Sequence, residues 1–178
     1  MPETDSERLR LTFDEDAERY ERAGPTYPSA LFDDLAALAC IGPTCRVLEI
    51  GCGTGQATAS LAERGCTIVC VELGPRMAAV ARRKLARFGS VQVEVAAFED
   101  WPLPSRPFDT VVAATAFHWI QPAVRVGKCA DALRAGGALA PERRRGLLAC
   151  VADLIDRHYA GRIRKRYMSE LRVAYARG

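Results

Sequence analysis

Short apolar runs alternate with helix-forming stretches over most of this chain. The apolar runs, which have the length and Val/Ile content of buried strands, are 46–50, 67–72, 91–96, 109–114 and a stub at 138–140. The helices predicted between them are 56–63, 75–87 and 122–133. Strands that alternate with helices in this way predict a parallel sheet covered by helices on both faces.

Further elements are predicted on either side of this alternating region. A polar helix is expected over 14–23, and a second helix follows that Ser29 can cap, with Leu31, Leu35 and Leu38 on one face. After Pro141, apolar residues fall at helical spacing from Leu147 to His158. From Tyr167 to Tyr175 every second residue apart from Ser169 is apolar, which predicts an edge or hairpin strand.

These elements predict one doubly wound, Rossmann-like α/β domain over residues 1–178. We expect an N-terminal cap segment (1–28), a Rossmann-like core (29–140), and a C-terminal helix with an antiparallel edge strand (141–178).

Composition narrows the class of protein. Of 178 residues, 49% are hydrophobic and 26% charged, and the net charge of +3 is too small to predict a nucleic-acid partner. The N-terminus has no apolar run of the kind that signal peptides carry, and no stretch has the length of a membrane span, so a cytoplasmic protein is expected. The seven cysteines are odd in number and lack C-x-x-C spacing, which favours buried apolar thiols over a metal site or disulfides.

A glycine-rich turn follows the first predicted strand and opens a helix. Its glycines, Gly51, Gly53 and Gly55, let the backbone approach a ligand closely at the carboxyl end of a strand. Such a loop also serves nicotinamide oxidoreductases, but Gln56 stands where their last glycine would be. Glu49 would repel a pyrophosphate and would suit an ammonium group instead. S-adenosylmethionine (SAM) has an amino-acid end and a ribose but no phosphate.

Glu72 ends the next predicted strand, 17 residues after Gly55. A carboxylate at that position can accept hydrogen bonds from both hydroxyls of a ribose. A solvated acid at a strand end is the alternative interpretation, and the nearby glycine loop favours the ribose.

Together these segments resemble class I SAM-dependent methyltransferases. The motifs that carry the resemblance are 47–55, Glu72, 98–101, 108–109, 116–119 and 133–137. Within that class the chain most resembles the small-molecule enzymes similar to trans-aconitate methyltransferase, whose N-terminal motif is echoed by Tyr20–Pro28.

The resemblance implies roles for individual residues. The cofactor-binding set it implies is Glu49, Gly51, Cys52, Gly53, Gly55, Glu72, Leu73, Phe98 and Glu99. In this set Leu73 and Phe98 would sandwich the adenine. The family usually has an Asp where this chain has Ala97, so recognition of the adenine amino group would be weaker or would shift to Glu99.

The methyl acceptor is expected to be a small molecule, held without a metal. His118 follows the fourth predicted strand and is a candidate general base, although it can equally pack with Trp119 at the rim. Tyr20 and Tyr27 are candidates to close over the acceptor, or else to pack the N-terminal helix.

The resemblance ends at Ala140–Pro141. The related enzymes continue the fifth strand there and then insert a segment that covers the substrate, whereas this chain passes directly into a helix. An internal deletion is the simplest account. It leaves open an alternative in which the domain binds SAM but has lost turnover together with its lid.

Overall fold

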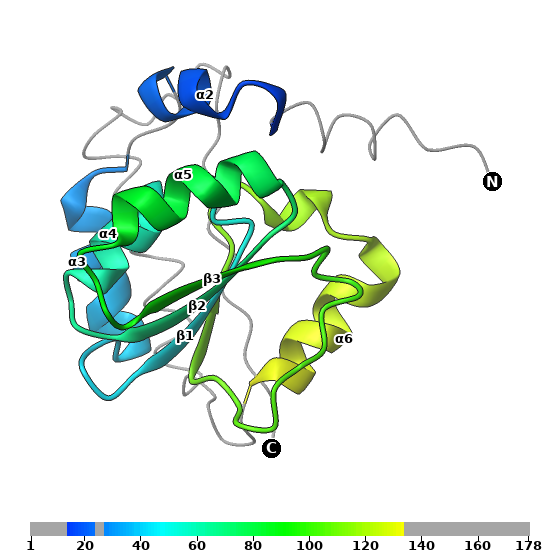
Figure 1. The fold of residues 1–178 in the computed structure, drawn as a ribbon. Coiled ribbons are helices and arrows are strands. Elements are labelled where there is room, and N and C mark those ends of the chain that lie inside the picture. The colour runs from blue at the N-terminus through cyan, green and yellow to red at the C-terminus, as the bar shows by residue number, and fades with distance from the viewer. Residues whose placement is uncertain (1–13, 24–26, 134–178) are drawn as a thin grey trace, which may run out of the picture.

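The structure of the protein is a computed structural model, which describes residues 14–23 and 27–133. Its strands are β1 Arg46–Ile50, β2 Thr67–Glu72, β3 Val91–Val95 and β4 Thr110–Val112. Its helices are α2 Ala17–Ala23, α3 Ser29–Ala39, α4 Gln56–Ala62, α5 Pro75–Leu85 and α6 Pro122–Ala132, and a short 3-10 helix spans Phe117–Trp119. Figure 1 shows how these elements are arranged.

The four strands form one parallel sheet in the order β3-β2-β1-β4. The chain builds outwards from β1 to β3 and then returns to place β4 on the other side of β1. In the central pairing Glu49 lies opposite Cys70, and on the other side it lies opposite Val112. The doubly wound parallel sheet predicted from the sequence is therefore confirmed, and its switch point lies between β1 and β4, where open α/β sheets bind ligands.

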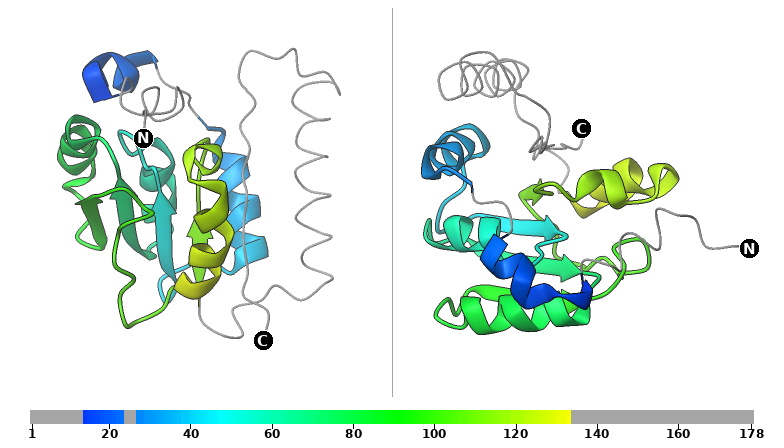
Figure 2. Two further views of the ribbon diagram at one scale, coloured as in Figure 1. Left: turned by 90° about the vertical axis from the view of Figure 1, so that its right-hand side faces the viewer. Right: turned by 90° about the horizontal axis from the view of Figure 1, so that it is seen from above.

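Helices cover both faces of the sheet, and each face has its own core. Phe32, Leu35, Leu61 and Leu85 from α3, α4 and α5 pack on one face. The opposite face packs against α6 and the segment between β3 and β4, with Phe108 completely buried. Seen from above, α3, α4 and α5 lie on one side of the strands and α6 lies on the other (Figure 2, right).

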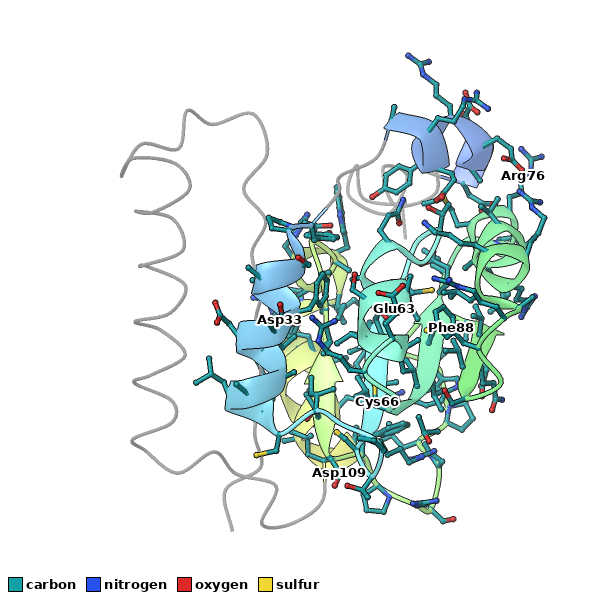
Figure 3. The ribbon with its side chains drawn as sticks, turned by 90° about the vertical axis from the view of Figure 1, so that its left-hand side faces the viewer. Asp33, Glu63, Cys66, Arg76, Phe88 and Asp109 are labelled. Carbon is teal, nitrogen blue, oxygen red and sulfur yellow. The ribbon has the colours of Figure 1, made fainter. Side chains whose placement is uncertain are left out.

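At the amino ends of the strands, Arg46 joins β1 to the segment before β4. The Arg46 N–H donates to Asp109 Oδ2 at 2.8 Å, and its guanidinium donates to the Pro107 carbonyl at 3.1 Å. The same guanidinium lies 3.9 Å from the centre of the Phe108 ring. Asp109 lies far from Arg76, which belongs to the opposite end of the molecule (Figure 3).

Two local predictions are wrong. Pro28, rather than Ser29, precedes the first turn of α3; Ser29 is already helical and the helix has no side-chain cap. The fourth strand is Thr110–Val112, shorter than the predicted 109–114, because Asp109 is engaged by Arg46 and the chain turns sharply at Thr115.

Several predictions fall outside the described residues: the strand stub at 138–140, the helix from Leu147, and the antiparallel edge strand. The division into three segments of one domain accordingly stays a prediction. None of the helices within 14–23 and 27–133 has the length and apolar character needed to cross a membrane.

Candidate functional site

The glycine loop between β1 and α4 has a backbone that only glycine adopts easily. Gly51, Gly53 and Gly55 have φ values of 67°, 58° and 86°. A Cβ on Gly51 would lie 2.6 Å from the Cβ of Ala116, and one on Gly55 would lie 2.9 Å from a methyl carbon of Leu85. The loop is therefore wedged between the turn after β4 and helix α5.

Glu72, at the end of β2, joins this loop to the next one. Its side chain is 8% exposed, and it accepts hydrogen bonds from the Gly53 N–H at 2.8 Å and from the Gly74 N–H at 2.9 Å. Burial raises the pKa of the carboxyl, and the two N–H groups only partly offset that effect. The carboxylate of Glu72 thus lies directly against the backbone of the glycine loop.

Glu49, in the penultimate position of β1, is 1% exposed. The Thr58 hydroxyl forms a hydrogen bond with it, and Cys70 Sγ lies 3.9 Å from Oε2. Burial is the main cause that raises the pKa of Glu49 to about 7, and the nearby Glu72 adds to it. Two acidic groups therefore lie at the carboxyl ends of adjacent strands, and the charge of Glu72 raises the pKa of Glu49.

Two tyrosines from the N-terminal segment reach the same edge. A Cβ on Gly53 would lie 3.7 Å from Cε1 of Tyr20, and the Tyr27 hydroxyl lies 3.3 Å from Oγ1 of Thr115. Burial raises the pKa of both phenols, and Glu72 and Glu49 respectively add to the effect. The structure therefore brings Tyr20 and Tyr27 together with the two acids.

Helix α2 is fastened across this edge by contacts with α5. The Met77 N–H, in the first turn of α5, donates to Asp14 Oδ1 at 2.8 Å. Glu18 pairs with Arg83 at 2.6 Å, and Glu21 pairs with Lys84 at 2.8 Å. Figure 1 shows α2 above α5. Gln56 Nε2, directly after the glycine loop, donates to Glu21 Oε2 at 3.3 Å, so α2 also lies against the start of α4.

Two residues of this edge were missed by the sequence analysis. Asp14 completes the first turn of α5 from 63 positions upstream, and nothing in the sequence indicates that pairing. Thr115 has a φ of 55°, which is rare for a threonine and is typical of strained positions near functional sites. A β-branched residue gives no signal for such a turn.

The predicted adenine residues have other contacts. Leu73 is half-buried, whereas Phe98 is 3% exposed and packs in the core on the α6 face, with Lys128 Nζ 5.4 Å from the centre of its ring. Glu99 Oε1 accepts a hydrogen bond from the Gln121 N–H at 3.0 Å, at the start of α6. Their roles toward a purine stay predictions.

His118 and Trp119 lie in the 3-10 helix after β4. The His118 side chain is exposed, and the two ring centres are 4.7 Å apart at an angle of 42°. This contact fits the packing alternative, and the catalytic role of His118 stays a prediction.

The thiols of the described region are free, and most are buried as expected. Cys52, within the glycine loop, is 5% exposed and donates to the Gly53 carbonyl at 3.6 Å, while Cys40 is exposed. A hydrogen bond with Cys70, followed by burial, raises the pKa of Cys52 well above its usual value. In the part of the chain that is described, no cluster of three or more His, Cys, Asp or Glu side chains is placed to hold a metal ion.

Known proteins with similar sequences include methyltransferases. Residues 47–137 match a family described as the methyltransferase domain. The chain is 36% identical over 131 residues to an uncharacterized methyltransferase of Mycobacterium tuberculosis, covering 74% of this chain and 51% of that protein. It is 32% identical over 143 residues to a malonyl-acyl-carrier-protein O-methyltransferase of Enterobacter lignolyticus, covering 79% and 55% of the two chains. The chain thus spans about half the length of these relatives.

Solved structures share the fold at low sequence identity. A SAM-dependent methyltransferase from Thiobacillus denitrificans, crystallised with S-adenosyl-L-homocysteine, is 21% identical with a TM-score of 0.56, covering 69% of this chain and 52% of that one. A cyclase, SpnF, is 19% identical with a TM-score of 0.63, covering 77% and 59%. A transferase and a cyclase on one fold show that the fold leaves the reaction open.

Proposed function

The chain belongs to the methyltransferase domain family, and on that premise we propose that it binds SAM at the carboxyl edge of its sheet and transfers the methyl group to a small molecule. One observation carries the proposal: two buried carboxyl groups, Glu49 and Glu72, lie on either side of a loop whose three glycines all have positive φ. SAM supplies the methyl group on an activated sulfonium when it is bound.

The residues at this edge match the chemical parts of the cofactor. Glu49 would face the ammonium of the amino-acid end, with the backbone of Gly51, Cys52, Gly53 and Gly55 around it. Glu72 would accept hydrogen bonds from the ribose hydroxyls. It already accepts one N–H group on each of its two oxygens, so the ribose would share or replace them. Leu73 completes this set beside the adenine.

Recognition of the adenine is the weakest part of this match. Phe98 is enclosed by the core and Glu99 is bonded at the start of α6, so each would have to share its present contacts with the purine. This supports the interpretation in which Ala97 leaves the adenine amino group with a weaker partner, at a cost of about 1 kcal/mol for one lost hydrogen bond.

The rate of methyl transfer at this edge would depend more on how the acceptor is positioned than on a strong general base. SAM is already activated, so alignment of the acceptor with the methyl carbon can supply most of the rate. Tyr20 and Tyr27 would cover the acceptor. Burial raises the pKa of both phenols further above the usual value of about 10, so both are protonated at neutral pH. His118 would serve only acceptors that must lose a proton, and would have to turn inward from its exposed position.

Calorimetric titration with SAM and with its demethylated product tests the binding proposal. Glu72→Ala would remove the two hydrogen bonds that the ribose hydroxyls donate to the carboxylate, worth roughly 3 kcal/mol in total. We therefore expect the variant to bind SAM about a hundredfold more weakly. Glu63→Ala is the matched control, because Glu63 follows α4 at the end away from the loop and pairs with Arg87 at 3.0 Å on the surface. Equal affinities for wild type and Glu72→Ala would refute the assignment to the ribose.

A radiolabelled methyl-transfer assay against a panel of small carboxylic acids tests the acceptor class. Turnover with an aconitate-like acid would support the finer proposal that the chain belongs with the trans-aconitate methyltransferase group. SAM binding with no turnover on any acceptor would instead favour a binding domain that has lost its activity.

A further inference from the structure

Glu49 is a buried acid without a cationic partner among the described residues. Each packed element presents to it a neutral or acidic group: Thr58 from α4, Cys70 and Glu72 from β2. The described ion pairs, Arg64–Asp33, Arg83–Glu18, Lys84–Glu21 and Arg87–Glu63, all involve other acids.

Among the residues that the structure describes, the other titratable groups that interact with Glu49 do not supply positive charge either. They are Cys52 from the glycine loop, Cys66 just before β2, and Tyr27 from the segment before α3. On the β4 side its backbone neighbour is Val112, which has no charge. An ionised Glu49 would therefore be a desolvated anion next to a second carboxyl group, which is an unfavourable arrangement.

The two hydrogen-bonding partners of Glu49 do not remove this cost. Both the Thr58 hydroxyl and the Cys70 thiol are neutral, and the sulfur is a weak donor at 3.9 Å. The carboxyl is 1% exposed, so water does not compensate for it either. Its pKa of about 7 agrees with a group that is largely protonated in slightly acidic solution.

We propose that Glu49 holds a proton in the free protein and releases it when the ammonium group of the cofactor arrives, so that cofactor binding is coupled to proton release. This inference rests on the proposed function. The O–H bond of the Glu49 carboxyl breaks, the proton passes to solvent or buffer, and the carboxylate that remains pairs with the ammonium. No electrons are transferred. The site loses one positive charge as the proton and gains one as the ammonium group, so the carboxylate and the ammonium together carry no net charge.

This coupling makes cofactor affinity depend on pH. When the free protein carries the proton, each unit of decrease in pH below about 7 should weaken binding by up to tenfold, since one proton must leave. Above about pH 8 an α-amino group begins to lose its own proton, so affinity should fall again. Affinity is expected to be highest between these two limits.

Calorimetry of cofactor binding in buffers of different ionisation enthalpy tests the proposal. At pH 6 the observed heat should vary with the buffer and should correspond to the release of about 0.9 proton per bound cofactor. At pH 8 Glu49 should release only about 0.1 proton. Glu49→Gln, which keeps the size of the side chain, should abolish the release at pH 6. Glu63→Gln, an exposed acid at the end of α4, should leave it unchanged.

The outcomes separate this inference from the proposed function. Absence of SAM binding at any pH would refute the proposed function itself. Binding without proton release at pH 6 would overturn the coupling and leave the binding intact. Release that survives Glu49→Gln but disappears in Glu72→Gln would overturn the assignment to Glu49, because Glu72 is the other buried carboxyl group at this edge.

Infrared difference spectroscopy gives a readout on wild-type protein without a ligand. The carbonyl stretch of a protonated buried carboxyl should disappear on titration through about pH 7, and it should also disappear at pH 6 when the cofactor is added. If no such band is present at pH 6, the acid is already ionised and the proposal is wrong. This measurement stands even if Glu49→Gln does not fold.

Discussion

The two ends of the parallel sheet are built differently. At the amino end, the charge of Arg46 meets two carbonyls and an aromatic face, and Asp109 accepts a backbone N–H. At the carboxyl end, Glu49 and Glu72 are buried among neutral donors. There the backbone is held in rare conformations, which include the one at Thr115.

Folding alone does not require the second arrangement. Buried acids without cations and residues with positive φ each cost stability, and natural proteins keep such features mainly where a ligand uses them. The comparison indicates that the amino end stabilises the sheet, while the carboxyl end is organised for a ligand that brings positive charge. Substitutions at the two ends should therefore affect stability and binding in different proportions.

The largest effect is expected at Gly51. Gly51→Ala forces a non-glycine residue into a φ of 67° and places a methyl group 2.6 Å from the Cβ of Ala116, so unfolding should require about 3 kcal/mol less. Urea denaturation measures this loss, and SAM affinity should fall with it. Gly42→Ala is the control, because no atom lies within 4 Å of its added Cβ, and it should change stability by less than about 0.5 kcal/mol. Equal stabilities for the two variants would mean that the loop is not sterically fixed.

An intermediate effect is expected from the titration of Glu49. Its pKa in the folded protein is about 7, above the ordinary 4.5, so between these values the folded state binds more protons than the unfolded state. Wild type should therefore lose stability relative to Glu49→Gln as the pH rises from about 4.5 to 7, by roughly 2–3 kcal/mol in total. Thermal and urea unfolding of both proteins across this range measure the difference. A constant difference would mean that the carboxyl is ionised throughout.

The smallest effect is expected at the amino end. Arg46→Met removes a guanidinium that contacts the Phe108 ring and the Pro107 carbonyl, and should cost about 1–2 kcal/mol of unfolding free energy. SAM affinity should stay within about twofold of wild type. Arg106→Met is the control, because it keeps the backbone carbonyl that accepts a hydrogen bond from Arg46. Weakened SAM binding in Arg46→Met would contradict the division of roles between the two ends.

The sequence predicted the central strands well because their chemistry is local. β1 and β2 begin and end where predicted, since each is a buried apolar run that stops at a glycine loop or at an acid. Glu49 is predicted from its place two residues before the first glycine, and Glu72 from its place at the end of the next strand. Sequence patterns of this kind depend only on neighbouring residues. They can therefore be read from the sequence without the three-dimensional contacts.

What the sequence did not predict depends on contacts between distant residues. Ser29 has the right chemistry for a helix cap, yet α3 begins one residue earlier, after Pro28. The Thr115 hydroxyl contacts Tyr27, 88 positions away, and the next residue, Ala116, packs against Gly51 of the glycine loop. The enclosure of Phe98 likewise follows from where α6 packs, which no local pattern contains.

The hydrogen bond between Asp14 and Met77 holds the chain just before α2 against α5. In α2 only Ala17 is buried, whereas four of the five residues of β1 are buried. Segments with few buried apolar contacts are the first to open in the native state. Amide hydrogens of α2 should therefore exchange with deuterium sooner than those of β1, so that the earliest fluctuation of the folded chain uncovers the edge where the two acids lie.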